Sequence, residues 1–154
     1  MATEKFFDEI ALPQILKWEG DYVNNPNDKG GSTNRGITQN TFNAWRNSKG
    51  ERHQDVKLIT MAEVRAIYFK NYWLAAGCDT MSNKFALLVF DTAVNMGVSR
   101  AKEFLRAAEW KYLEKFIAAR RAKYEEFAKY GNQKIFLQGW LNRLNDLERV
   151  VNRL

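Results

Sequence analysis

The sequence has one cysteine, Cys78, one histidine, His53, and two prolines. A single cysteine excludes an internal disulfide, so packing must hold the fold together. A single histidine leaves too few ligands for a histidine-based zinc site, and it allows only one Cys–His pair as a catalytic dyad. His53 lies in a polar run typical of an exposed loop, and Cys78 has a context typical of an inert, half-buried thiol. We therefore expect no thiol chemistry, no metal and no cofactor.

Long apolar runs are also missing. The first ten residues have neither the basic start nor the apolar core of a signal peptide, and no window approaches the length of a membrane span. We expect a chain that is made in the cytoplasm and does not insert stably into a membrane. If its substrate lies outside the membrane, another factor must deliver the protein there.

The 154 residues suffice for one domain with a real core, and we expect a single domain over residues 1–154. The net charge is +6, and it is unevenly spread. Residues 100–154 contain 13 Lys and Arg against 7 Asp and Glu, whereas residues 1–99 contain 11 of each kind. The basic C-terminal part, 99–154, suits a polyanion such as nucleic acid, anionic lipid or the bacterial cell wall, and charge alone does not choose among them.

Apolar residues at helical spacing predict a mainly α fold. The expected helices lie near residues 4–19, 38–48, 60–77, 85–97, 99–130 and 135–151, the fifth possibly with one break. Pro13 predicts a kink or a late start in the first helix. Thr38 and Ser99 are expected N-caps, and Thr60 with Glu63 has the pattern of a capping box.

Two segments stand out from this pattern. The run 85–90 is apolar on nearly all sides, which places its helix at the centre of the core. Segment 20–36 is too polar for a core and too rich in Gly and Asn for a helix. It predicts a short, irregular β-hairpin with its tip at residues 27–31. The predicted architecture is a helical bundle with one small hairpin beside it.

Glu19 is the first candidate for chemistry. It lies at the end of the first apolar helix, and Trp18 and Tyr22 could exclude water from its carboxyl group. Gly20 would let the backbone bend so that this carboxyl faces a cleft. A glycosidase needs such a protonated acid and a second group that stabilises the sugar cation or holds water. The alternative is that Glu19 is an ordinary exposed residue at a helix end.

Asp28 follows nine residues later, and a hairpin folded over the helix end would bring both carboxylates to one cleft. Its alternative role is to form the turn, because Asn-Asp-Lys-Gly-Gly is a strong turn sequence. Asp21 is a weaker candidate carboxylate. Thr33 or Ser32 could hold a nucleophilic water, although a hairpin hydroxyl is the plainer interpretation of both.

The stretch 19–38 resembles the signature of the glycoside hydrolase family 108 muramidases. That signature reads Glu-Gly-Gly-Tyr and then Asn-x-Pro-x-Asp-x-Gly-Gly-x-Thr-Asn-x-Gly-Ile-Thr, and Asp21 here replaces its second glycine. The similarity continues in order through residues 67–73, 90–97 and 139–143. The resemblance implies an α+β, lysozyme-like fold with the hairpin beside the active-site cleft.

The resemblance also implies a function: cleavage of peptidoglycan glycan strands beside N-acetylmuramic acid, as in phage endolysins. Glu19 matches the catalytic glutamate and Asp28 the acidic position of the motif, with Thr33 as a water holder. The candidates for sugar contacts are Tyr22, Asn34 and Asn95, of which Asn95 could instead cap the central helix. A monomer acting on the bacterial wall is expected, reached by holin-type or other release without a signal peptide.

Two other functions stay open from the sequence. The first is a muramidase-like module that binds or localises to peptidoglycan without cutting it, which the unusual Asp21 beside Glu19 keeps open. The second is a basic nucleic-acid binder, which rests on the C-terminal charge and has no recognition motif. We therefore expect no nucleic-acid partner.

Overall fold

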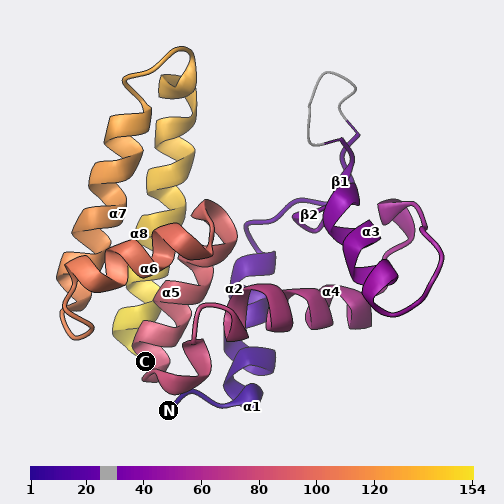
Figure 1. Ribbon diagram of the computed structural model, residues 1–154. Helices are drawn as coiled ribbons and strands as arrows, with labels where there is room; N and C mark the ends of the chain where they lie inside the picture. The colour runs from indigo at the N-terminus through magenta and orange to yellow at the C-terminus, as the bar shows by residue number, and fades with distance from the viewer. Residues whose placement is uncertain (25–30) are drawn as a thin grey trace.

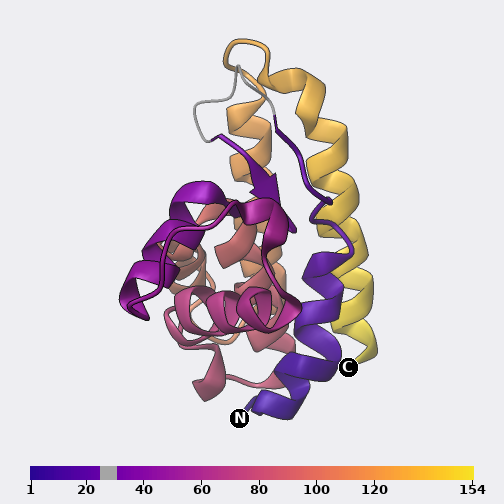
Figure 2. The ribbon, with the colours of Figure 1, turned by 90° about the vertical axis from the view of Figure 1, so that its right-hand side faces the viewer.

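The computed structural model describes residues 1–24 and 31–154, and it is an α+β, lysozyme-like fold (Figures 1 and 2). In chain order the elements are α1 (Glu4–Phe6), a π-helical segment (Phe7–Ala11), α2 (Leu12–Leu16), β1 (Thr33–Asn34), β2 (Ile37–Thr38), α3 (Gln39–Ser48), α4 (Met61–Tyr68), a second π-helical segment (Phe69–Leu74), α5 (Asn83–Met96), α6 (Val98–Ala107), α7 (Leu113–Phe127) and α8 (Leu137–Arg153). Short 3₁₀ turns occupy Val56–Leu58, Cys78–Thr80 and Gln133–Phe136. Both chain termini lie at one end of the molecule (Figure 1).

The first predicted helix is continuous but changes its winding. The N–H of Leu12 bonds to the carbonyl of Phe7, five residues back, and Pro13 follows in the first turn of α2. A proline has no N–H to donate and its ring needs space in the preceding turn. The wider π segment provides this space, so the predicted kink at Pro13 takes the form of a local change in helix type.

The hairpin forms around a tight turn. Thr33 pairs with Thr38 and Asn34 with Ile37, and both residues of the connecting turn, Arg35 and Gly36, have positive φ angles of 51° and 81°. Positive φ at both central positions is typical of the type I′ turn that suits a two-residue hairpin. Val23 also forms an antiparallel bridge with Thr33. The predicted tip at 27–31 lies mostly outside the described residues.

Two of the predicted helix starts are confirmed. The Thr38 hydroxyl accepts from the Thr41 N–H at 3.1 Å, and Thr60 and Glu63 form a complete capping box before α4. The prediction of Ser99 as a cap is wrong, because α6 starts directly after Gly97 and Ser99 lies inside its first turn. The break predicted in this stretch falls between α6 and α7.

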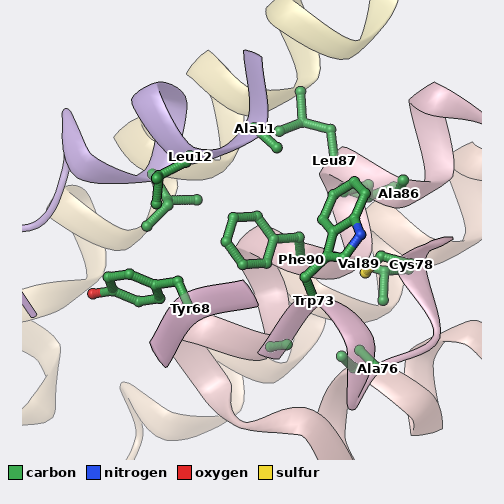
Figure 3. Close-up of a cluster of buried hydrophobic side chains, with 14 of the residues drawn as sticks. Ala11, Leu12, Tyr68, Trp73, Ala76, Cys78, Ala86, Leu87, Val89 and Phe90 are labelled. Carbon is green, nitrogen blue, oxygen red and sulfur yellow. The ribbon is translucent and has the colours of Figure 1, made fainter. Parts of the chain in front are cut away.

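The core is centred on α5, as predicted. Its residues 85–93 are all buried, and Figure 3 shows several of them in one cluster with side chains of the first helix and of the segment 68–78. Phe7, from the first π-helical segment, has its ring 5.2 Å from that of Trp73 and 5.4 Å from that of Phe90. Cys78 is buried in the same cluster, and this burial raises the pKa of its thiol. The thiol therefore stays protonated and is not a nucleophile.

Asp146 ties α2 to α8, which lie side by side (Figure 2). Its Oδ2 accepts hydrogen bonds from Gln14 Nε2 at 2.9 Å, Lys17 Nζ at 2.7 Å and Trp18 Nε1 at 3.0 Å. Burial disfavours the charged carboxylate, but these hydrogen bonds and the charge of Lys17 lower the pKa of Asp146 to about 2. The ionised form therefore holds the end of α2, next to Glu19, in place.

This tether predicts a pH-dependent contribution to stability. Because the folded pKa lies below the unfolded value of about 3.9, the contribution is full above that value and is lost as the pH falls towards the folded pKa. Replacing Asp146 with Asn should lower the free energy of unfolding at neutral pH by roughly 1–3 kcal/mol. Urea unfolding of both proteins across the acid range should show the difference shrinking between these two pKa values. A difference independent of pH would contradict the assignment, and the exposed Asp79→Asn serves as control.

Candidate functional site

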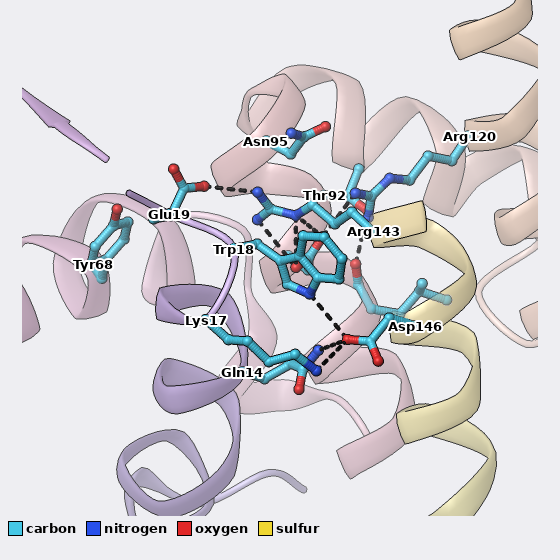
Figure 4. Close-up of polar contacts among 12 residues, drawn as sticks. Gln14, Lys17, Trp18, Glu19, Tyr68, Thr92, Asn95, Arg120, Arg143 and Asp146 are labelled. Atoms are coloured by element: carbon cyan, nitrogen blue, oxygen red, sulfur yellow. Dashed lines mark hydrogen bonds and ion pairs between the residues drawn. The ribbon is translucent and has the colours of Figure 1, made fainter. Parts of the chain in front are cut away.

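Glu19 lies at the C-terminal end of the first helix. Its N–H bonds to the carbonyl of Ile15 at 3.1 Å, which extends helical geometry to this residue. The side chain is 19% exposed, and its Oε1 accepts a hydrogen bond from Arg143 Nη1 at 2.8 Å (Figure 4). The carboxyl group is thus fixed by α8 while part of it still faces solvent.

Arg143 belongs to a group of four charges that we call the charge quartet: Glu19, Asp91, Arg120 and Arg143. Asp91 is completely buried on α5, and both of its oxygens lie 3.2 Å from Arg143 Nε. Its Oδ1 is also 2.8 Å from Nη2 of the fully buried Arg120. Two positive and two negative charges balance, which is what a buried charged group requires.

The quartet determines the ionisation of its buried members. Burial disfavours the charged form of Asp91, but the charges of Arg143 and Arg120 and their hydrogen bonds keep its pKa below the usual range. Burial disfavours the charged form of Arg143 too, but Asp91 and Glu19 raise its pKa. Both side chains stay ionised throughout the physiological range.

A chain of hydroxyl and amide groups connects the quartet, through Arg120 on α7, to the C-terminal end of α5. Arg120 donates to Thr92 Oγ1 at 2.9 Å and to Tyr124 Oη at 2.9 Å, and the Tyr124 hydroxyl donates to Oδ1 of Asn95. Asn95 is the last polar residue of α5, and it also lines a pocket of about 280 Å³ with Met96, Arg100, Tyr124, Phe127 and Trp140. Among the residues 1–24 and 31–154, no hydrogen-bond partner is found for its amide NH₂.

The other carboxyl oxygen of Glu19, Oε2, faces the hairpin turn. A Cβ atom placed on Gly36 would lie 2.6 Å from this oxygen and 2.5 Å from Tyr68 Oη. Tyr68 donates its hydroxyl hydrogen to the carbonyl of Arg35 at 2.6 Å. Burial, followed by the charge of Glu19, raises the pKa of Tyr68, so its phenol stays protonated. The turn, the phenol and the carboxyl group therefore meet at Gly36.

Replacing Gly36 with Ala should disrupt this meeting point. The added methyl would overlap Tyr68 Oη and Glu19 Oε2, and φ +81° is unfavourable for alanine. We expect a loss of roughly 1–3 kcal/mol in the free energy of unfolding, together with displacement of the carboxyl group. Thermal unfolding would measure this loss. Gly50→Ala is the matched control, since it has φ +69° and nothing within 4 Å. Equal losses for both variants would mean that backbone strain alone matters.

The aromatic residues predicted to exclude water from Glu19 make their polar contacts with other residues. Trp18 points its indole N–H at Asp146, at 3.0 Å (Figure 4). Tyr22 is half-buried, with its hydroxyl 3.5 Å from Ser32 Oγ and Lys57 Nζ 5.6 Å from its ring centre. Gly20 is absent from the glycines with positive φ in the described chain, so the bend beside Glu19 needs no left-handed backbone there.

The remaining predicted residues lie in or near the hairpin. Thr33 is part of β1, half-buried, with its backbone paired to Val23. Asn34 donates its amide to the carbonyls of Val56 at 3.2 Å and Lys57 at 3.3 Å, so it braces the hairpin. Asp21 is exposed, and it has no ion pair within the described ranges. Asp28 lies outside the described residues, so its position relative to Glu19 stays a prediction.

Sequence reasoning missed the charge quartet as a unit. One signal was available: Asp91 is a carboxylate within an apolar helix expected at the centre of the core, and a buried carboxylate needs a cationic partner. Arg143 lies in the stretch 139–143 that resembles the family, but nothing in that stretch identifies it as the partner of a carboxylate. Nothing in the sequence around Arg120 distinguishes it from the other cations of the same segment, Lys115, Arg121 and Lys123.

Glu19, held by an arginine, lies beside a small hairpin within a lysozyme-like α+β fold, an arrangement compatible with a glycosidase. The sequence model of the Glycosyl hydrolase 108 family matches residues 12–97, which include Glu19, the hairpin and α5. The chain belongs to this family. Its fold is similar to the solved structure of Brucella abortus SagA, with a TM-score of 0.78 and 25% sequence identity over 99% of this chain and 96% of that one. A search of curated proteins found no match.

Within the described residues, no helix combines the length and apolar character needed to cross a membrane.

Proposed function

We propose that this protein is an N-acetylmuramidase that hydrolyses the bond between N-acetylmuramic acid and N-acetylglucosamine in peptidoglycan, with Glu19 as general acid. The observation that supports it best is the placement of Glu19 in a glycosyl hydrolase fold: one carboxyl oxygen is fixed by Arg143 and the other faces the hairpin turn.

In this proposal the two carboxyl oxygens of Glu19 have different roles. A guanidinium has donors only, so Oε1, which binds Arg143, must accept. The proposed donor to the leaving sugar oxygen is therefore Oε2, on the side of Gly36 and Tyr68. Arg143, anchored by Asp91, limits the rotation of the carboxyl group, which keeps the acid aligned with the bond that breaks.

The second group of the reaction belongs to the segment after Glu19. Asp28 is proposed to stabilise the developing positive charge on the sugar or to activate water, and Thr33 to hold that water. Tyr22 and Asn95 are proposed to contact the glycan, since both are only half-buried and Asn95 lines a pocket. The proposed site of action is the bacterial cell wall.

The test is the release of reducing ends from purified, nuclease-treated peptidoglycan. The protein should generate them in proportion to time and enzyme concentration. Sedimentation of the protein with walls, with no reducing ends released, would contradict catalysis. It would support the alternative of a peptidoglycan-binding module. One observation favours that alternative: the Glu19–Arg143 ion pair also ties the first helix to α8, a structural role that a non-catalytic relative would retain.

A further inference from the structure

A second pocket lies at the opposite end of α5 from Glu19. It has a volume of about 550 Å³, a size typical of ligand sites. The residues that matter for its chemistry are Met81, Phe85, Leu105, Lys102, Arg106 and Trp110. The first three form an apolar wall and the others bring cations and an indole ring. None of them belongs to the charge quartet or the hairpin.

The two cations share one face of α6. Lys102 and Arg106 are four residues apart, so their side chains extend from neighbouring turns of the helix. Neither forms an ion pair with any residue in 1–24 or 31–154. They lie in the C-terminal part of the chain, which carries the whole net charge of +6. The pocket is therefore suited to an anion.

The backbone at Trp110 has an unusual conformation, and its side chain is exposed to solvent. The end of α6 has the two hydrogen bonds of a Schellman motif, from Trp110 N to Leu105 O and from Glu109 N to Arg106 O. Glycine is usual after such a helix end, yet Glu109 and Trp110 both have positive φ, 54° and 55°. The indole remains 62% exposed. This costly conformation presents a large apolar ring at the pocket rim instead of burying it.

The polar groups of the pocket argue against a sugar or a peptide as its ligand. The Thr80 hydroxyl already donates to the Gly77 carbonyl at 2.7 Å, and the Ser82 hydroxyl caps α5 by accepting from Phe85 N at 3.4 Å. A glycan or peptide backbone needs many hydrogen-bond partners when it is bound. A lipid needs only cations for its phosphate and an apolar wall for its chains, and an exposed Trp beside Lys and Arg is typical of proteins at a membrane surface.

We infer that this pocket binds the surface of a membrane that contains anionic phospholipid, with phosphates at Lys102 and Arg106 and Trp110 among the upper acyl groups. The 14 residues of α5 separate the pocket from the Asn95 end of the helix by about 20 Å. A chain bound in this way turns Glu19 away from the membrane. This orientation towards the wall rests on the proposed function, whereas the lipid binding does not.

The test is co-sedimentation with vesicles of phosphatidylcholine alone or of an equimolar mixture with phosphatidylglycerol. The intact chain should bind the mixed vesicles, and Lys102→Gln with Arg106→Gln should weaken this binding roughly thirtyfold. The matched control removes two exposed cations far from the pocket, Lys129→Gln with Lys134→Gln. Equal weakening by both pairs, or no binding of mixed vesicles, would overturn the proposal.

A second measurement checks Trp110 itself. Lipids brominated near the headgroup should quench the fluorescence of the intact chain more than that of Trp110→Phe. Titration with soluble glycan fragments, followed through the indole N–H resonance of Trp110, should leave that resonance unchanged. A shift there, or equal quenching in both proteins, would overturn lipid binding at this pocket. Neither readout depends on hydrolysis, so lipid binding can fail while the muramidase proposal stands, and the reverse.

Discussion

Replacing Glu19 with Gln should lower the rate of peptidoglycan hydrolysis by roughly 10²–10⁴-fold, the usual contribution of a general acid. Glutamine has nearly the same shape, and its carbonyl oxygen can still accept from Arg143, so the fold should persist. It cannot deliver a proton, because an amide is not an acid in this pH range. Initial rates on purified walls, together with thermal unfolding, measure the two properties separately.

Glu125→Gln is the matched control for this variant. Glu125 is exposed on α7 and has no ion pair among the residues that the structure describes, so its loss removes one carboxylate and leaves the site intact. It should retain the full rate. A folded Glu19→Gln protein that clears walls as fast as this control would remove Glu19 from the mechanism.

Replacing Asp91 with Asn should destabilise the protein by about 3–5 kcal/mol, the usual cost of breaking a buried ion pair. Asp91 is fully buried, and it is the carboxylate that both Arg120 and Arg143 share. Without its charge the quartet changes from neutral to a net +1 inside the core. Urea unfolding at neutral pH measures the effect. The rate of hydrolysis should also fall, because Arg143 loses the anchor that aligns Glu19.

Two further variants show whether a loss of stability in Asp91→Asn comes from the charge quartet. Asp79→Asn removes an exposed carboxylate and should change the free energy of unfolding by less than about 0.5 kcal/mol. Combining Asp91→Asn with Arg120→Met restores charge balance and should recover part of the lost stability. If Asp91→Asn costs no more than Asp79→Asn, the quartet does not stabilise the fold as described.

Local signals in the sequence predicted much of the secondary structure. The capping box at Thr60 and Glu63 and the cap at Thr38 depend only on residues close in the sequence, so they can be predicted locally. The apolar run of α5 is sufficient by itself to predict the centre of the core. Ser99 was misassigned because Gly97 already ends α5 and lets α6 begin two residues earlier. A serine near a helix start is not always its cap.

The site was predicted only in part. Glu19 could be singled out because a carboxylate at a helix end before a glycine-rich turn is visible in one short stretch. Its partners could not, since Arg143 comes from the last helix and Tyr68 from α4, and only the fold brings them to the same carboxyl group. The sequence suggests Asn34 as a sugar contact, and this stays a prediction, while the structure adds that its amide donates to two backbone carbonyls. An asparagine in a hairpin can brace its neighbours as readily as bind a ligand.

The most direct test of the central claim is mass analysis of the soluble products released from purified peptidoglycan. The muramidase proposal predicts fragments that end in a hydrated, reducing N-acetylmuramic acid, in samples with the intact chain and not with Glu19→Gln. Reducing N-acetylglucosamine ends, anhydro-muramic acid ends or free stem peptides would each show a different reaction. Any of these, or the same products from the Glu19→Gln protein, would contradict the account.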